Sequence, residues 1–271
     1  MIFAALLGAL MFCGVSAASA QQPSGYKPAL DQPGKDVVWV PTPDALVTRM
    51  LDLAKVGASD HVIDLGSGDG RLVIMAAKRG AHAHGIEYDA KLVAFAQQQA
   101  KQAGVAGKAT FAKADLFDSD FSQATVVTLF LGPELNRKLM PKLLNLKPGT
   151  RIVSNTHPIG DWPADEIAES TDDEKSVYYR KALLWVVPAK VSGVWRSPQE
   201  IVSFTQRYQT MSGSVTAQGK PAPITEARLR GHQISFSAGG AKYAGVVSGG
   251  AIAGTVTSAG AQRAWRASRS Q

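Results

Sequence analysis

The chain has 271 residues, of which 45% are hydrophobic and 19% are charged, and its formal net charge is +7. This composition predicts a packed globular protein and excludes a disordered chain, and the length allows one large domain or a medium domain with a small one. Cys13 is the only cysteine, so the chain can form no internal disulfide and no cysteine-based metal site.

The N-terminus has the pattern of a targeting segment. Residues 2–18 carry no charge, and Ala18-Ser19-Ala20 matches the small-x-small pattern of a cleavage site. We therefore expect residues 1–20 to be a signal peptide or an N-terminal anchor, although no Lys or Arg precedes the apolar run. This interpretation predicts an exported, periplasmic or membrane-anchored protein, and the protein is cytoplasmic if the interpretation is wrong.

Residues 21–35 are rich in Gly, Pro and polar side chains and are expected to form a linker. From residue 36 to residue 188, short apolar runs alternate with helical patterns, as in a doubly wound parallel sheet. Helices are predicted at 44–58, 70–79, 89–104 and 134–145. Strands are predicted at 61–65, 82–87, 108–113, 124–130, 149–154, 166–170 and 182–187, the last two joined across a charged loop at 172–175.

The composition changes after Pro188. Residues 189–271 contain short Val, Ile, Thr and Phe runs separated by glycine turns, which predicts a small antiparallel β domain of about six strands. This segment carries ten Lys and Arg residues against Glu200 and Glu226. The excess of positive charge suggests an anionic partner such as a polyanion or a membrane surface, and the alternative is a solvated basic surface.

The string Asp64-Leu65-Gly66-Ser67-Gly68-Asp69-Gly70 follows the apolar run Val62-Ile63. Glycines at alternate positions allow a sharp turn and a close approach of the backbone to a ligand. The turn lies at the carboxyl end of a predicted strand, where open α/β sheets bind ligands. Its spacing is G-x-G-x-G, which differs from the G-x-G-x-x-G of dinucleotide-binding proteins.

Two further acidic residues follow the next two predicted strands. Glu87 ends the apolar run His84-Gly85-Ile86, where a carboxylate can accept hydrogen bonds from both hydroxyls of a ribose. Asp115 follows Phe111-Ala112-Lys113-Ala114 at the end of the third strand. Acidic residues at the ends of three strands indicate a cofactor site more specifically than the glycine turn does alone.

These residues resemble motif I and the following motifs of the class I S-adenosylmethionine (SAM) methyltransferases. Together with Val40-Pro41-Thr42-Pro43, they are similar to the ATP synthase c-subunit lysine methyltransferase group and its bacterial relatives, over about residues 37–160. The resemblance implies a Rossmann-like seven-stranded sheet, SAM as the cofactor, and a methyl acceptor that is a protein lysine. It implies no metal. The cofactor-binding residues that it implies are Asp64, Gly66, Ser67, Gly68, Gly70, Glu87, Tyr88, Asp115 and Leu116.

No catalytic residue is evident. The fourth strand ends at Leu131-Gly132-Pro133, where a methyl-acceptor motif lies in the family, and it offers no side chain suited to abstract a proton. Polar candidates at this rim are Glu134, Asn136, Asn155 and His157, of which Asn155 and His157 are the candidate catalytic residues. The segment from Trp39 to Pro43 is a candidate lid, and Thr42 or Asp44 is expected to cap the first helix.

Two other functions are compatible with the sequence. An exported, non-catalytic binding protein could keep the SAM-type fold and use its basic β domain on an anionic surface. A nucleotide-dependent oxidoreductase is the third interpretation, and the glycine spacing argues against it.

Overall fold

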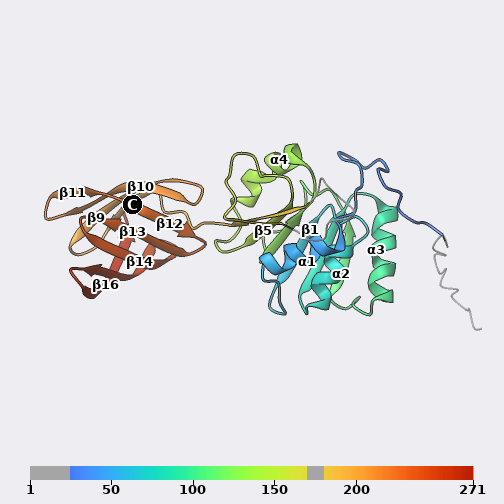
Figure 1. The fold of residues 1–271 in the computed structure, drawn as a ribbon, viewed down its shortest axis with the longest axis horizontal. Coiled ribbons are helices and arrows are strands. Elements are labelled where there is room, and N and C mark those ends of the chain that lie inside the picture. The colour runs from blue at the N-terminus through green and yellow to red at the C-terminus, as the bar shows by residue number, and fades with distance from the viewer. Residues whose placement is uncertain (1–24, 170–179, 271) are drawn as a thin grey trace, which may run out of the picture.

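The computed structural model describes residues 25–169 and 180–270, which form two domains connected end to end (Figure 1). The predicted targeting segment at 1–20, the first residues of the linker and the charged loop at 172–175 lie outside the described residues. Within the part of the chain that the structure describes, no helix has the length and apolar character needed to cross a membrane.

The first domain is a mixed sheet with four helices. The helices are α1 (Asp44–Leu53), α2 (Arg71–Lys78), α3 (Ala90–Gln102) and α4 (Pro133–Leu143). The strands are β1 (His61–Leu65), β2 (His82–Glu87), β3 (Ala109–Lys113), β4 (Val126–Leu129), β5 (Arg151–Asn155), β6 (Glu166–Glu169) and β7 (Lys181–Val186).

The strand order of this sheet is β3-β2-β1-β4-β5-β7-β6. Strands β1 to β5 pair in parallel, and β7 pairs antiparallel with both β5 and β6. The predicted seven-stranded methyltransferase sheet with a closing hairpin is therefore confirmed. The carboxyl ends of β1, β2 and β4 lie together at one edge, because β1 is central and pairs with both of the others.

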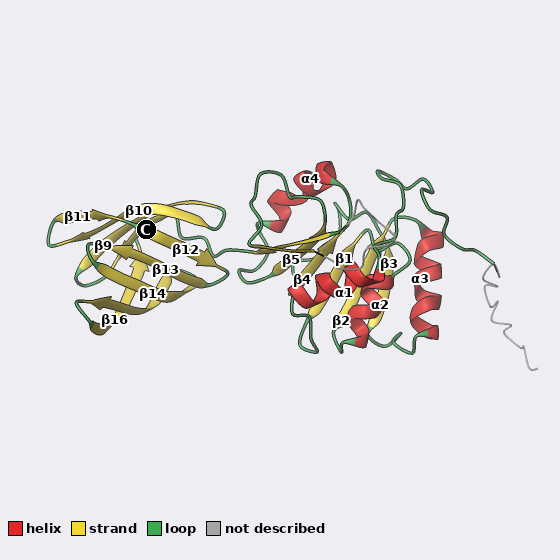
Figure 2. Cartoon of the chain, in the orientation of Figure 1, coloured by secondary structure: helices red, strands yellow, loops and turns green. Residues whose placement is uncertain are grey.

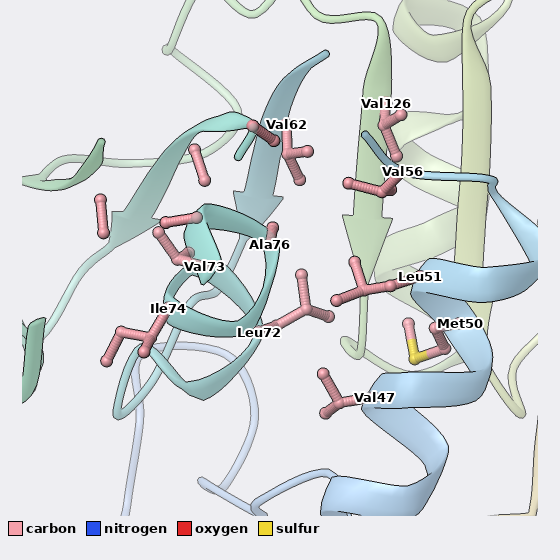
Figure 3. Close-up of a cluster of buried hydrophobic side chains, with 14 of the residues drawn as sticks. Val47, Met50, Leu51, Val56, Val62, Leu72, Val73, Ile74, Ala76 and Val126 are labelled. Carbon is pink, nitrogen blue, oxygen red and sulfur yellow. The ribbon is translucent and has the colours of Figure 1, made fainter. Parts of the chain in front are cut away.

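Helices cover both faces of the sheet (Figure 2). Apolar side chains of α1 and α2 pack together against β1 and β4, as Figure 3 shows for Val47, Leu51, Leu72 and Val73. Side chains of α4 belong to a second buried cluster on the other face. The sequence predicted the first helix through residue 58, but α1 ends at Leu53, because the chain turns and then returns Val56 to the core.

The second domain is one antiparallel sheet of nine strands with its own buried core. The strands are β8 (Gly193–Arg196), β9 (Glu200–Arg207), β10 (Thr210–Ala217), β11 (Lys220–Pro223), β12 (Thr225–Arg230), β13 (Gln233–Ala238), β14 (Ala241–Ser248), β15 (Ala251–Ser258) and β16 (Ala261–Arg269). The sheet order is β11-β10-β9-β8-β16-β15-β14-β13-β12. The expected antiparallel β domain is confirmed.

The predicted count of about six strands is too low, and not every glycine of this segment makes a turn. Gly213 lies inside β10, where a Cβ would come within 1.8 Å of the Ser203 carbonyl oxygen on β9, so glycine is needed for a close approach of strands. The β9–β10 turn instead uses Tyr208, which has a φ of 54° without being glycine. Since non-glycine residues seldom adopt this conformation, the turn carried no glycine signal.

The β9–β10 turn also packs against the first domain. Tyr208 stacks on Trp162 with ring centroids 6.0 Å apart, and its hydroxyl donates to Asp161. The indole N–H of Trp162 donates to Gln209 Oε1 at 2.8 Å. Arg230 pairs with Glu166 at the start of β6. These contacts use the loop between β5 and β6 and the adjoining strand.

Candidate functional site

A pocket lies at the carboxyl ends of β1, β2 and β4. It encloses about 1000 Å³ of space, counting the solvent at its mouth. Its walls come from the segment 32–42, the glycine turn after β1, the ends of β2 and β3, and the chain from β4 into α4. This is the edge of an open α/β sheet at which ligands bind.

The glycine turn lies so close to neighbouring side chains that Gly66 and Gly68 leave no room for a Cβ. Gly66 and Gly68 have φ values of 78° and 53°. A Cβ on Gly66 would lie 2.6 Å from Leu131 Cδ2, and one on Gly68 would lie 2.4 Å from Trp39 Nε1. Both positions line the pocket. Larger residues there would therefore push its opposite walls apart.

Gly70 belongs to the motif but does not line the pocket. It is the N-cap of α2 with a φ of 82°, and a Cβ there would lie 2.7 Å from Phe111 Cζ and 2.8 Å from Ala96 Cβ. Its glycine therefore serves the packing of α2 against β3 and α3. The other eight residues expected to bind the cofactor do line the pocket.

Asp64 is buried at the end of β1. The Thr128 hydroxyl donates to its Oδ1 at 2.7 Å. Burial raises the pKa of this carboxyl to about 7, and the nearby carboxylates of Glu87 and Asp69 act in the same direction. A cation bound in the pocket would favour the ionised form of Asp64 and lower this pKa.

Glu87 fixes the glycine turn to the end of β2. Its Oε2 accepts the N–H of Gly68 at 2.9 Å, and its Oε1 accepts the N–H of Asp89 at 2.9 Å. Each carboxylate oxygen can accept a further hydrogen bond. The nearby Ser67 hydroxyl is buried, and its oxygen has no hydrogen-bond partner among the described residues.

Asp115 is tied to a segment that is distant in sequence. Its Oδ1 accepts the N–H of Phe117 at 2.9 Å, and its Oδ2 accepts a hydrogen bond from the Lys35 ammonium. The Lys35 Nζ also lies 5.0 Å from the centre of the Tyr88 ring. The ion pair lowers the pKa of Asp115 and raises that of Lys35.

Residues 32–42 form a strap along one wall of the pocket. The strap is closed at its base by hydrogen bonds from Asp31 N to Trp39 O at 3.0 Å and from Trp39 N to Gln32 O at 2.9 Å. Arg71 donates to Thr42 O at 2.9 Å from the start of α2. The sequence assigned residues 21–35 to a linker, but the pocket wall begins at Gln32.

The expected side-chain cap of the first helix is wrong. The N-cap of α1 is Pro43, and no side chain caps the helix. Thr42 is buried, and its hydroxyl oxygen accepts a hydrogen bond from Asn155 Nδ2 at 3.2 Å. Thr42 lines the pocket, so its contact with Asn155 fixes the end of the strap instead of the start of the helix.

None of the four polar candidates at the acceptor rim lines the pocket. Asn136 is fully buried and donates to Ser154 Oγ at 3.1 Å, which is a structural role. Asn155 lies behind Thr42. His157 stacks on Phe130 with centroids 6.0 Å apart, and burial lowers its pKa. Glu134 is exposed and pairs with Arg137.

The charges around the pocket are predominantly negative. Six carboxyl groups and two cationic side chains line it. The carboxyl groups belong to Asp36, Asp64, Asp69, Glu87, Asp89 and Asp115, and the cations to Lys35 and Arg71. Both cations are already paired with carboxylates of the same set. The site therefore favours a ligand with positive charge.

Comparison with known proteins identifies the class of this site. The ANTKMT methyltransferase domain family matches residues 64–166. A protein-lysine N-methyltransferase of Saccharolobus islandicus (strain REY15A) is 44% identical over 139 residues, which are 50% of this chain and 86% of that protein. A mouse ATP synthase c-subunit lysine N-methyltransferase is 40% identical over 105 residues, and the match spans 38% of this chain and 42% of that protein.

A solved structure supports the same class. The RNA methyltransferase from Salinibacter ruber, crystallised with S-adenosyl-L-homocysteine, is 44% identical with a TM-score of 0.52. The match covers 56% of this chain and 96% of that one. The predicted SAM-dependent methyltransferase class and its cofactor are confirmed. The relatives differ in the acceptor that their names give, a protein lysine in two cases and RNA in the third.

Proposed function

Because the chain belongs to the class I SAM-dependent methyltransferases of the ANTKMT group, we propose that it transfers a methyl group to the side-chain amine of a protein lysine. The observation that carries this proposal is the 44% identity to a protein-lysine N-methyltransferase, of which this chain covers 86%.

We assign the cofactor to the pocket residues around the glycine turn. Asp64 and Ser67 would hold the methionine end, Glu87 the ribose hydroxyls, and Asp115 and Leu116 the adenine. The acidic lining of the pocket supports this fit, because SAM carries a positive sulfonium.

When bound, SAM supplies an electrophilic methyl group. The chain's own residues would bring the acceptor amine into line with it and exclude water, through the apolar wall of Leu129, Leu131 and Leu135. An apolar wall also favours the neutral amine, which is the form able to accept a methyl group. No rim base is needed for this step, because the acceptor ammonium releases its proton to bulk water before the apolar wall encloses the neutral amine.

Methyl transfer to protein and to RNA can be compared in one extract. The full chain is incubated with tritium-labelled SAM and with the protein and RNA fractions of a bacterial lysate, each treated to remove the other. The proposal predicts label in protein that is recovered as methyl-lysine after acid hydrolysis. Label recovered only in nuclease-sensitive material would overturn the lysine acceptor while keeping the methyltransferase class.

We further propose that the outer face of β12–β16 contacts an anionic lipid surface. Arg228, Lys242 and Arg266 are exposed on β12, β14 and β16, and they have no carboxylate partner among the described residues. Of the two acids of this domain, Glu200 is buried against Arg263, and Glu226 lies exposed on β12, where it accepts from Ser237. Aromatic side chains suited to stack on bases are buried in the core instead.

Each Lys or Arg near an anionic membrane contributes about 1 kcal/mol, so the three together correspond to roughly 100-fold in affinity. Replacing all three by Gln should weaken binding to vesicles of phosphatidylglycerol by that factor. The matched control replaces the exposed Lys55, Lys78 and Lys101 of the first domain. Equal loss in both triple variants, or a preference for nucleic acid over vesicles, would contradict the proposal.

A further inference from the structure

The Lys35 ammonium donates a hydrogen bond to Asp115, the carboxylate that we assign to the adenine of the cofactor. The proposed function assigns Asp115 to the exocyclic amine of adenine, and the inference below rests on that assignment. Of the two oxygens of Asp115, Oδ1 already accepts from Phe117 N at 2.9 Å. Oδ2 accepts from the Lys35 ammonium. Oδ2 can accept a second hydrogen bond, but an incoming amine would lie there against the Lys35 ammonium, which repels its partly positive hydrogens.

The position of Lys35 is held by more than one contact. Its Nζ lies 5.0 Å from the centre of the Tyr88 ring, which is a cation–π distance, and Tyr88 lines the same pocket. Asp36 adds a weaker contact, with its Oδ2 at 3.9 Å from Nζ. The side chains of Lys35 and Asp115 are 37% and 21% exposed, so water can reach the pair and the contact can open.

The strap carries Lys35 over the site. Backbone hydrogen bonds of Trp39 with Asp31 and with Gln32 close its base, and Trp39 places its indole beside Gly68 in the glycine turn. The end of the strap is held by Arg71, which donates to Thr42 O. Lys35 is thus attached at the adenine end of the pocket, while the anchors at Trp39 and Thr42 lie toward the methionine end.

We propose that Lys35 competes with the adenine amine for Asp115 and so latches the strap over the cofactor site. Cofactor binding exchanges one hydrogen bond at Asp115 Oδ2 for another, and Lys35 moves into solvent. The latch therefore lowers the affinity for SAM and for its product and slows their association.

The test compares three full-length variants with the wild type by calorimetric titration with S-adenosylhomocysteine and by stopped-flow tryptophan fluorescence. Lys35→Met keeps the length of the side chain and removes its charge. It should bind about fivefold more tightly and associate faster, because an exposed ion pair no longer has to break. Lys27→Met removes a charge from the exposed chain before the strap and should match the wild type. Lys35→Arg keeps a cation beside Asp115 and should retain the weaker affinity.

Titration with S-inosylhomocysteine, in which an oxygen replaces the adenine amine, measures the selectivity. Only the ligand with the amine breaks the ion pair between Lys35 and Asp115, so the wild type should prefer S-adenosylhomocysteine by a smaller factor than Lys35→Met does. If Lys35→Met binds S-adenosylhomocysteine no more tightly than the wild type, or more weakly, the latch is wrong while the cofactor site stands. If the folded wild type binds no S-adenosylhomocysteine, the proposed function fails and the latch with it.

Discussion

The buried carboxyl of Asp64 makes cofactor binding depend on pH. Burial raises its pKa to about 7, and the Thr128 hydroxyl at 2.7 Å acts in the opposite direction. With that pKa, about 10% of Asp64 is ionised at pH 6 and about 90% at pH 8. If a cationic ligand needs the ionised form, its affinity should rise about tenfold between these values, which corresponds to about 1.4 kcal/mol.

In the absence of ligand, the raised pKa of Asp64 makes the folded protein less stable as the pH rises. An unfolded Asp has a pKa of about 3.9, so the folded protein binds the proton more tightly. The free energy of unfolding should therefore fall as the pH rises from about 4 to about 7, by as much as about 4 kcal/mol. Above pH 7 this contribution is constant.

Asp64→Asn provides the matched variant. An amide keeps an oxygen to accept from Thr128, fits the same space and cannot ionise. Calorimetric titration with SAM at pH 6, 7 and 8 should show a rise in affinity for the wild type that the variant lacks. Any titration of the ligand itself is common to both proteins and cancels in the comparison. Equal slopes for the two proteins would refute the role given to Asp64.

Three other substitutions have defined expectations. Glu87→Gln turns one acceptor into a donor that faces a backbone N–H, so the glycine turn should lose about 1–3 kcal/mol of stability in denaturant unfolding, and SAM binding measured by calorimetry should weaken with it. Gly213→Ala places a Cβ within 1.8 Å of Ser203 O and should cost about 2–4 kcal/mol in denaturant unfolding of the β domain; an unchanged midpoint would show that the strands can separate. Arg151→Gln leaves the buried Asp60 without its cation and should cost about 3 kcal/mol. Burial alone would raise the pKa of Asp60, but that cation and two other hydrogen-bond donors outweigh burial and hold the pKa low. The loss should therefore be full at neutral pH and shrink as the pH falls through that low pKa, which urea titrations at pH 7 and pH 3 can measure.

The sheet and the pocket floor could be predicted because they depend on local patterns. Short apolar runs that end in Asp64, Glu87 and Asp115 place three carboxylates at one edge as soon as the strands are parallel. The glycine spacing then indicates where the backbone must approach a ligand. These features need no information about contacts between distant segments.

The pocket wall could not be predicted in the same way. Lys35 and Asp115 are 80 positions apart, and nothing in the composition of residues 21–35 distinguishes a linker from a strap. Asn155 was expected at the rim, but its contact with Thr42 spans 113 positions and holds it behind the wall. The strand count of the β domain was too low because three of its turns contain no glycine: the β9–β10 turn, where Tyr208 has a positive φ, and the β8–β9 and β11–β12 turns.

The central claim is that the pocket at the ends of β1, β2 and β4 holds SAM through the carboxylates after the strands that line it. The most direct measurement is calorimetric titration of the chain with SAM, beside a Glu87→Ala variant whose fold is checked by circular dichroism. The account predicts one site with micromolar affinity that the variant lowers by at least tenfold. Binding of equal strength in both proteins would place the cofactor elsewhere, and absence of binding in the folded wild type would contradict the account.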